Sequence, residues 1–486
     1  STRVRSSAAS DVYKRQTLVS VLEFAGFFLL IPYFVGLLYG EKERYAFLLI
    51  AAACLLIGFA GRLFKPKSKV FYAREGFVTV SLSWIILSLI GAVPFVLTGE
   101  IPSYVDAVFE TASGFTTTGA TILTDVEALA RCTQFFRLST HWVGGMGVLV
   151  FILSIVPLSG SYNMHLVRAE SPGPSVGKLV PRVKNTARIL YIIYIAITVA
   201  EIICLLIAGM PLFDSVTMTF STVGTGGYSI LNTGTATYSM AVQAIIMIFM
   251  FLCGINFSMY YLLIAKKPGD VLKNTELKAY VGIVAGATLL IAVNVRGYFA
   301  NFGEALFQSA FHVTSIITTT GLSGRDFNLW PSFSKMILFL LMIVGASAGS
   351  TGGGFKVSRL VVLVKSVKNE IQKVIHPRSI KKLHMDGRAL PEDLIRSILV
   401  YTGIYVLLSF ASILIVSLDN FSFETNVSAV MATLNNIGPG LDVVGPTGNF
   451  SAFSDASKVV MIFDMLAGRL ELIPILVLFS PQTWKK

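Results

Sequence analysis

Four segments rich in threonine and glycine recur along the chain, and each follows a short amphipathic stretch that has an acidic residue near its start. Backbone carbonyls and threonine hydroxyls are hard oxygen ligands of the kind that replaces the water around an alkali cation. Glycine permits the backbone angles that turn several carbonyls toward one side. The segments therefore indicate cation binding by oxygen atoms. They read VDAVFETASGFTTTGATIL (105–123), FDSVTMTFSTVGTGGYSIL (213–231), FGEALFQSAFHVTSIITTTGLSG (302–324) and FETNVSAVMATLNNIGPGL (423–441).

Aligning the segments on their first acidic residue gives one equivalent glycine in each. The second segment allows two registers, because Gly224 within TVGTG competes with Gly227. The first acid lies 13 positions before both Gly119 and Gly227, which favours Gly227. The alternative interpretation, that the segments are simply outer turns, is weaker for four matched copies than for one. The predicted ion-binding residues are Thr117, Thr118, Gly119, Thr225, Gly226, Gly227, Thr319, Thr320, Gly321, Asn436, Ile437 and Gly438.

The elements that carry these segments belong in a bilayer. The chain of 486 residues is 54% hydrophobic and only 14% charged, with a mean hydropathy of +0.72, which does not suit a water-facing surface. Crossing about 30 Å of hydrocarbon takes about 20 apolar helical residues. The sequence predicts ten such spans, at 17–38, 46–62, 76–98, 136–158, 189–210, 238–264, 279–297, 335–363, 394–418 and 457–480.

The net charge of +12 is distributed by topology, which argues against a nucleic-acid partner. Alternate connections and the two termini hold 30 of the 39 Lys and Arg residues, so the positive-inside rule predicts that both termini are cytoplasmic. The other connections carry acidic residues, which either concentrate cations at an outer mouth or form ordinary solvated surface. These residues are Asp106, Glu110, Asp125, Glu127, Asp214, Glu304, Asp326, Glu424, Asp442 and Asp455.

Each Thr- and Gly-rich segment lies between two long apolar spans, so the chain contains four helix, pore-loop, helix repeats. Non-helical backbone at membrane depth is tolerated only where it is buried or lines a water-filled cavity. We therefore expect an all-α integral membrane protein with a pseudo-fourfold arrangement and two extra N-terminal transmembrane helices. The predicted parts are an N-terminal tail (1–16), the extra helices (17–75) and repeats at 76–160, 161–265, 266–364 and 365–486, the second and fourth with cytoplasmic lead-in loops.

The eighth predicted span contains a glycine-rich interruption. It reads GASAGSTGGGFK from residue 345 to 356, and a helix cannot run unbroken through five glycines in twelve residues. The stretch nearly matches the phosphate-binding loop GxxxxGK[ST], but Phe355 stands where that loop needs lysine and no strand precedes it. Nucleotide binding is therefore not expected there. The interruption is either a kink for helix packing or a functional loop.

The tenth predicted span contains three charged residues, Asp464, Arg469 and Glu471. A charge at the centre of a bilayer costs about 2.5 kcal/mol or more unless it is paired or faces water. Arg469 therefore either pairs with a carboxylate on a neighbouring helix or faces the ion pathway.

The chain resembles the membrane subunits of the bacterial Trk potassium uptake systems, in the wider Trk, Ktr and HKT superfamily. The similarity covers nearly the whole chain after residue 16. Together the matching motifs are specific, although none would be alone. They are SGFTTTGAT (113–121), HWVGGMG (141–147), GSTGGGFKV (349–357), TLNNIGPGL (433–441) and MLAGRLE (465–471).

This resemblance implies a potassium filter to which each repeat gives one glycine. In plant relatives, a serine at the place of Gly119 accompanies sodium permeation, so Gly119 implies a filter that prefers potassium. The second and fourth segments depart from the TTTG consensus, which bears on how strict that selectivity is. It also implies a gate beneath the filter, a homodimer in the bacterial inner membrane, and control by a cytosolic ring of nucleotide-binding TrkA subunits; membrane lipids are the other expected partners. The implied gate residues are Gly345, Gly349, Ser350, Thr351, Gly352, Gly353, Gly354 and Arg469.

An alternative function is secondary active transport that couples potassium or another solute to protons or sodium. Such folds usually consist of two inverted halves, whereas four repeats in the same sense favour a pore. No nucleophile and base arrangement for an enzyme is evident, and the five histidines show no ligand spacing with cysteines or carboxylates. Apart from potassium ions in the filter, no cofactor is expected.

Overall fold

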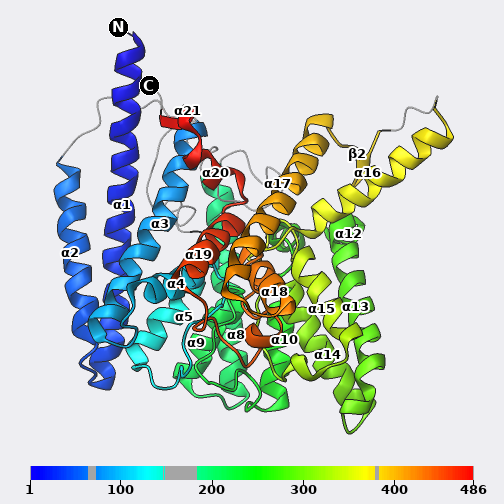
Figure 1. Cartoon of the computed structure of the whole chain (residues 1–486), viewed down its shortest axis with the longest axis horizontal. Coiled ribbons are helices and arrows are strands. Elements are labelled where there is room, and N and C mark those ends of the chain that lie inside the picture. The colour runs from blue at the N-terminus through cyan, green and yellow to red at the C-terminus, as the bar shows by residue number, and fades with distance from the viewer. Residues whose placement is uncertain (1, 64–72, 146, 148–182, 378–381, 485–486) are drawn as a thin grey trace.

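The computed structural model describes residues 2–63, 73–145, 147, 183–377 and 382–484, and these are almost entirely helical (Figure 1). The predicted all-α membrane fold is confirmed. Six of the described helices are long and apolar enough to cross a membrane, or seven if one bent pair counts as a span. The long helices present large apolar side chains to their outside, for example Leu38, Leu407 and Leu414, which are more than 70% exposed. Such a surface suits contact with lipid.

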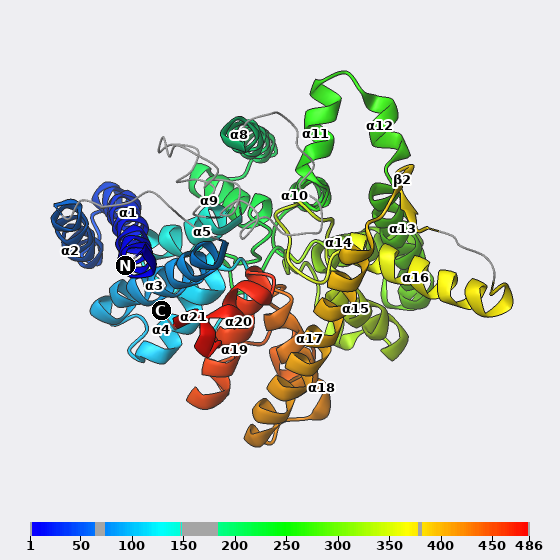
Figure 2. The same ribbon diagram turned by 90° about the horizontal axis from the view of Figure 1, so that it is seen from above.

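Two N-terminal helices lie together at one side of the molecule, α1 (Thr2–Tyr39) and α2 (Arg44–Arg62) (Figure 1). Helix α1 begins at Thr2, so residues 2–16, which were predicted to be a tail, form the first part of this helix. The chain then follows four repeats, which succeed one another around a common centre (Figure 2). The first helices of the repeats are α3 (Ala73–Thr98), α8 (Val183–Ile207), α13 (Thr275–Val295) and α17 (Glu392–Val416).

A short helix follows in each repeat and ends near the molecular centre. Each has an acidic residue in its first turn, which favours a helix N-terminus, and the serine or asparagine caps of α4, α14 and α18 accept hydrogen bonds from backbone N–H groups. The predicted pore-loop helices are thus present. They are α4 (Tyr104–Phe115), α9 (Leu212–Val223), α14 (Phe302–Ile317) and α18 (Phe423–Leu434).

In the last three repeats the second helix is shorter than predicted because it stops at a break. Span 238–264 bends by 89° between α10 and α11, span 335–363 opens into a loop after α15, and span 457–480 breaks after α19. The part of span 136–158 beyond Gly145 lies outside the described residues. The break in span 335–363 was predicted, whereas uninterrupted helices were wrong for spans 238–264 and 457–480. The helices are α5 (Arg131–Gly145), α10 (Met240–Cys253), α11 (Phe257–Ile264), α15 (Ser332–Val344), α16 (Val357–Ile375), α19 (Asp455–Arg469) and α20 (Ile473–Phe479).

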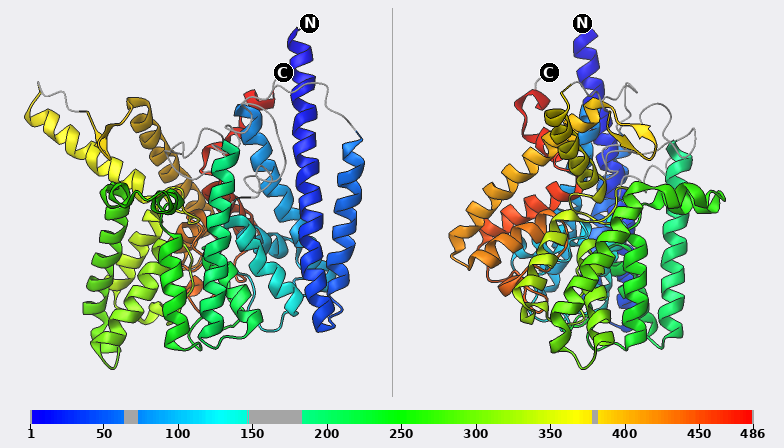
Figure 3. Two further views of the ribbon diagram at one scale, coloured as in Figure 1. Left: turned by 180° about the vertical axis from the view of Figure 1, so that it is seen from behind. Right: turned by 90° about the vertical axis from the view of Figure 1, so that its right-hand side faces the viewer.

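The remaining elements are small. Both termini, the β-hairpin and α16 lie toward the same face of the molecule (Figures 1 and 3). The basic connection 160–188 lies almost wholly outside the described residues. The small elements are α12 (Pro268–Lys273), α21 (Pro481–Trp484), β1 (His384–Met385), β2 (Arg388–Ala389) and 3-10 turns at Arg296–Tyr298, Phe327–Leu329, Ser417–Asp419 and Asp442–Val444.

The largest apolar core joins the N-terminal helix pair to the first and fourth repeats. Phe136 of α5 lies at its centre, with ring centroids 5.3 to 5.8 Å from those of Phe28, Phe47 and Phe95. This packing anchors α5 close to the end of α4, and so supports the segment that follows α4.

Candidate functional site

The four short helices end in the same way. The second residue after each helix has a left-handed backbone, with φ of 56° at Thr117, 51° at Thr225, 58° at Thr319 and 55° at Asn436. Two positions later a glycine again has positive φ, between 75° and 96°. Gly224 instead caps α9 with φ of −68°. Gly227, not Gly224, therefore shares the backbone conformation of the other three glycines.

Repeated hydrogen bonds hold these helix ends. The N–H of the residue after each left-handed position bonds to a carbonyl five residues back, at 2.8 or 2.9 Å in all four repeats. The left-handed residue itself bonds three residues back, which completes a Schellman cap. Such a cap normally uses glycine, because a β-branched residue is strained there. The four bonds join Thr118 to Ser113, Gly226 to Ser221, Thr320 to Ser315 and Ile437 to Ala432.

The four segments form a closed ring. Each glycine lies so near the carbonyl of the next repeat that an added methyl group would come within 2.8 Å of that oxygen. A side chain at any of these glycines would therefore displace a neighbouring carbonyl. In order around the ring, the contacts are Gly119 with Gly226, Gly227 with Thr320, Gly321 with Ile437, and Gly438 with Thr118.

The departures from TTTG in two repeats have local causes. In the second repeat, the imidazole of His141 occupies the space that a side chain at Gly226 would need. Its Nδ1 lies 2.8 Å from the Gly114 carbonyl oxygen, and its Nε2 lies 3.3 Å from the Tyr228 nitrogen. In the fourth repeat, the amide of Asn436 donates to the Thr118 hydroxyl at 2.9 Å. In both repeats a side chain, that of His141 or Asn436, therefore links the segment that lacks a threonine to the neighbouring repeat.

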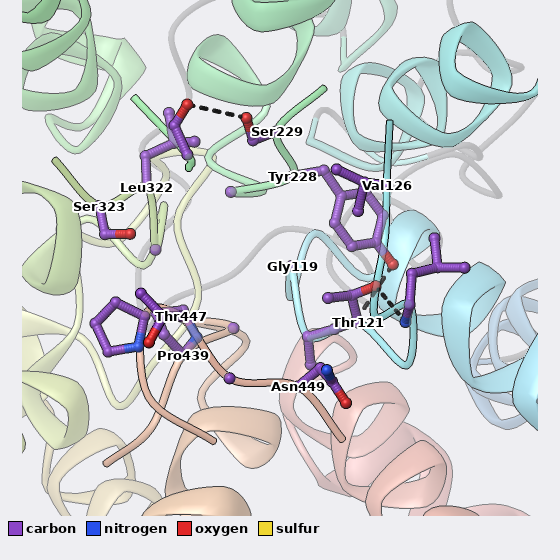
Figure 4. Close-up of a pocket in the computed structure, with 18 of the residues that line it drawn as sticks. Gly119, Thr121, Val126, Tyr228, Ser229, Leu322, Ser323, Pro439, Thr447 and Asn449 are labelled. Carbon is purple, nitrogen blue, oxygen red and sulfur yellow. Dashed lines mark hydrogen bonds between the residues drawn. The ribbon is translucent and has the colours of Figure 1, made fainter. Parts of the chain in front are cut away.

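A cavity of about 210 Å³ opens outside the ring (Figure 4). Gly119, Tyr228, Leu322 and Pro439 line it, one from each repeat (Figure 4). Among the described residues, the lining includes no Asp or Glu. Backbone and mostly uncharged side chains, with Arg137 as the charged lining residue, therefore border the entrance in place of a ring of carboxylates.

Glu110, considered above as an outer surface charge, is instead buried behind the first segment. Its carboxylate accepts hydrogen bonds from the Thr121 hydroxyl at 3.0 Å and the Ile122 N–H at 3.1 Å, and it pairs with Arg137 at 2.5 Å. The guanidinium of Arg137 also lies over the ring of Tyr228, 3.5 Å from its centroid. This buried ion pair fixes the chain as it leaves the first segment.

The loop between α15 and α16 lies against the other side of the ring. Gly353 donates its N–H to the Thr319 hydroxyl at 2.6 Å. A methyl group on Gly352 would lie 2.7 Å from the Thr318 carbonyl oxygen, and one on Gly353 would lie 2.5 Å from that of Asn435. The predicted gate residues are thus brought together with the third and fourth segments.

Arg469 reaches the same place from the end of α19. Its guanidinium donates to the Thr117 hydroxyl at 3.3 Å and to the Thr351 carbonyl at 2.9 Å. It also donates to the carbonyls of Gly144 and Gly145. The side chain therefore links the first Thr- and Gly-rich segment, the loop and the C-terminal end of α5.

Sequence reasoning missed three residues that support this site: His141, Glu276 and Lys356. The carboxylate of Glu276 accepts from the N–H of Ala348 at 2.6 Å, and the ammonium of Lys356 donates to the Gly352 carbonyl. Glu276 was hidden because an acid two residues after the cap Asn274 is explained by its place in the first turn of a helix. Lys356 was counted as a cytoplasmic charge, although it is 1% exposed.

A membrane-embedded ring of four segments, each borne by a re-entrant helix, defines a membrane transport protein for cations. Comparison with known proteins agrees. The model of the family described as "TrkH: Cation transport protein" matches residues 44–486, so the chain belongs to this family.

Relatives of known name cover nearly the whole chain. The Trk system potassium uptake proteins TrkH of Salmonella typhimurium and Escherichia coli are both 35% identical to it, over 96% of this chain and 97% of theirs. The crystal structure of the potassium transporter TrkH from Vibrio parahaemolyticus is similar with a TM-score of 0.86 and 29% identity, covering 97% of this chain and 99% of that one.

Proposed function

We propose that this protein takes up potassium across the bacterial inner membrane through a filter formed by the four segments. The closed ring of backbone carbonyls around the four glycines carries the proposal. Carbonyl dipoles replace the hydration shell of an alkali cation without a fixed anion that would trap it. The short helices direct their C-termini, the negative ends of their dipoles, toward the ring, which further favours a cation. The names of the relatives support potassium as the ion.

Conduction is channel-like and is gated by the loop containing Gly345 and residues 349–354, together with Arg469. The loop lies against the third and fourth segments, where it obstructs the pathway. At an effective dielectric constant of 20, a fixed positive charge about 4 Å from the path opposes a monovalent cation by about 4 kcal/mol. The guanidinium of Arg469 supplies this charge, so opening requires both groups to move.

The face that carries both termini, α12 and the β-hairpin is cytoplasmic. Lys266, Lys267 and Lys273 lie at or in α12, in agreement with the positive-inside rule. This face receives a cytosolic nucleotide-binding subunit of the TrkA type, which controls the gate. Two copies of the chain form a homodimer in the lipid bilayer. The Trk system to which the relatives' names refer supports a regulatory partner.

Proton-coupled potassium transport is the second candidate, and two carboxyl groups favour it. Glu201 of α8 and Asp464 of α19 are both fully buried. Ionisable groups within the membrane often mark proton pathways. Acidification inside liposomes that accompanies rubidium uptake would favour this candidate, whereas uptake without proton movement would favour the channel.

Arg469→Ala tests the gate. In liposomes holding the purified chain alone, we expect rubidium uptake at least about tenfold above that of the unmodified protein, since each ~1.4 kcal/mol removed from the barrier of about 4 kcal/mol raises the rate about tenfold. Deletion of Gly349–Gly354 should act in the same direction. Arg396→Ala on the exposed start of α17 is the matched control and should change nothing. Unchanged uptake by a folded Arg469→Ala protein would contradict the gating role.

A further inference from the structure

The loop that lies against the ring is fastened at both ends by one carboxylate, that of Glu276. The oxygen Oε1 accepts the N–H of Ala348, near the start of the loop, at 2.6 Å. The same oxygen accepts the N–H of Ser358, just beyond its end, at 3.1 Å. Glu276 lies in the first turn of α13, is 5% exposed, and has the cation of Lys356 as an attractive electrostatic neighbour. One buried side chain thus sets the distance between the two ends of the loop.

The two residues before Glu276 are bound from the side that carries the termini. The carboxylate of Asp386 accepts the Thr275 N–H at 2.7 Å and the Asn274 side-chain amide at 3.1 Å. Asn274 is itself the cap of α13, since its oxygen accepts the N–H of Leu277 at 2.8 Å. Asp386 therefore holds the start of the helix turn that carries Glu276.

Asp386 belongs to the small β-hairpin that precedes α17. Asp386 and Gly387 both have positive φ, 51° and 76°, which defines a tight two-residue turn. The hairpin is also fastened to α16, because the ammonium of Lys365 donates to the His384 carbonyl at 2.8 Å. Helix α16 begins directly after the loop. The hairpin therefore contacts both α13, which carries Glu276, and α16, which begins after the loop.

We propose that Glu276 is the positioning residue of the gate and that the hairpin with Asp386 at its tip is the lever that moves it. Displacement of the hairpin by a cytoplasmic partner shifts the first turn of α13 and withdraws Oε1 from the two N–H groups. The loop ends are then released together. Because one oxygen accepts from both ends, a movement of this oxygen breaks the two bonds at the same time. The inference rests on the proposed gating function.

Rubidium uptake by liposomes that hold the purified full chain tests the proposal. Glu276→Ala removes the shared acceptor and should raise uptake about tenfold, whereas Glu276→Gln keeps an acceptor oxygen and should stay near the unmodified level. Asp386→Gly keeps the left-handed turn while removing the carboxylate, and it should raise uptake about threefold. Asp386 is exposed, so we expect this variant to fold. Asp270→Ala, an exposed carboxylate of α12, is the control and should have no effect.

Two further readouts separate the outcomes. Faster hydrogen exchange at Ala348 and Ser358 in Glu276→Ala is expected if the carboxylate clamps both ends. The double variant of Glu276→Ala and Asp386→Gly should match Glu276→Ala alone, because both act through one connection. If Arg469→Ala raises uptake but Glu276→Ala and Asp386→Gly do not, the lever is wrong and the gate stands. If none of the three raises uptake, the gating function itself is wrong.

Discussion

Thr117, Thr225 and Thr319 adopt left-handed backbone angles that β-branched side chains avoid. The cost is about 1 to 2 kcal/mol at each residue. Strain of this kind persists only where the surroundings enforce it, and it gathers at functional sites. Here the Schellman hydrogen bonds and the contacts between repeats enforce it. The strained residues set the direction of the carbonyls that precede the ring glycines.

Gly119→Ser tests the ring at the scale of one residue. Its side chain would collide with the Gly226 carbonyl, so we expect the sodium to rubidium uptake ratio to rise about tenfold. Gly209→Ser is the matched control, because Gly209 also has positive φ, of 87°, but has no atom of another residue near its missing side chain. A ratio that stays constant in Gly119→Ser, or that rises equally in Gly209→Ser, would remove Gly119 from the filter.

Single residues show where sequence reasoning reaches its limit. The ring glycines were predictable, since their spacing from the first acid is visible in the sequence. The left-handed threonines were not, because their conformation opposes the local preference of threonine and depends on contacts between repeats. His141 was also hidden, because its two partners, Gly114 and Tyr228, lie 27 and 87 positions away.

At the scale of elements, the ion pair of Glu110 and Arg137 joins α4 to α5. Glu110→Gln would leave the Arg137 guanidinium buried without its counter-charge, and breaking a buried pair in this way costs about 3 to 5 kcal/mol. We expect denaturant unfolding in detergent to show this loss. The exposed pair of Lys373 and Glu370 provides a control, and Glu370→Gln should change stability by less than about 1 kcal/mol. Equal losses of stability in Glu110→Gln and Glu370→Gln would contradict the stabilising role of the buried ion pair.

The start of α18 should be sensitive to acid. Hydrogen bonds from the hydroxyls of Ser422 and Thr425 hold the pKa of the Asp442 carboxyl below its ordinary value. A carboxyl whose pKa is lowered by folding contributes stability above its unfolded pKa, about 3.9, and loses it as the pH falls through the folded value. Hydrogen exchange at the start of α18 should therefore rise below about pH 4. Asp442→Asn should abolish that rise, and an unchanged pH profile in this variant would contradict the assignment.

Element existence was easier to predict than element continuity. Repeated apolar spans and acidic starts indicated four helix, pore-loop, helix repeats. The breaks in the second helices were missed in the sixth and tenth spans. In the sixth span, one glycine in an apolar run is tolerated by a helix, and in the tenth span the break at residues 470–472 contains no glycine. Gly254 marks a break because the Tyr280 hydroxyl and the Thr318 methyl group crowd it, a contact that depends on the third repeat.

At the scale of the molecule, the ring closes through residues at opposite ends of the chain. Asn436 donates to Thr118 across 318 positions, and Lys458 pairs with Asp106 at 2.6 Å across 352 positions. Periodicity predicts that four repeats exist. That the first and fourth repeats lie next to each other follows only from the folded arrangement. The closed ring allows four unlike segments to act as one site.

The most direct measurement of the central claim is the uptake of rubidium and sodium by liposomes holding the purified chain alone, driven by an imposed potassium gradient. A carbonyl ring selective for potassium predicts that rubidium enters and sodium does not, with a higher rate but the same preference in Arg469→Ala. Equal entry of both ions, or no entry of either ion in Arg469→Ala, would contradict a self-contained potassium filter.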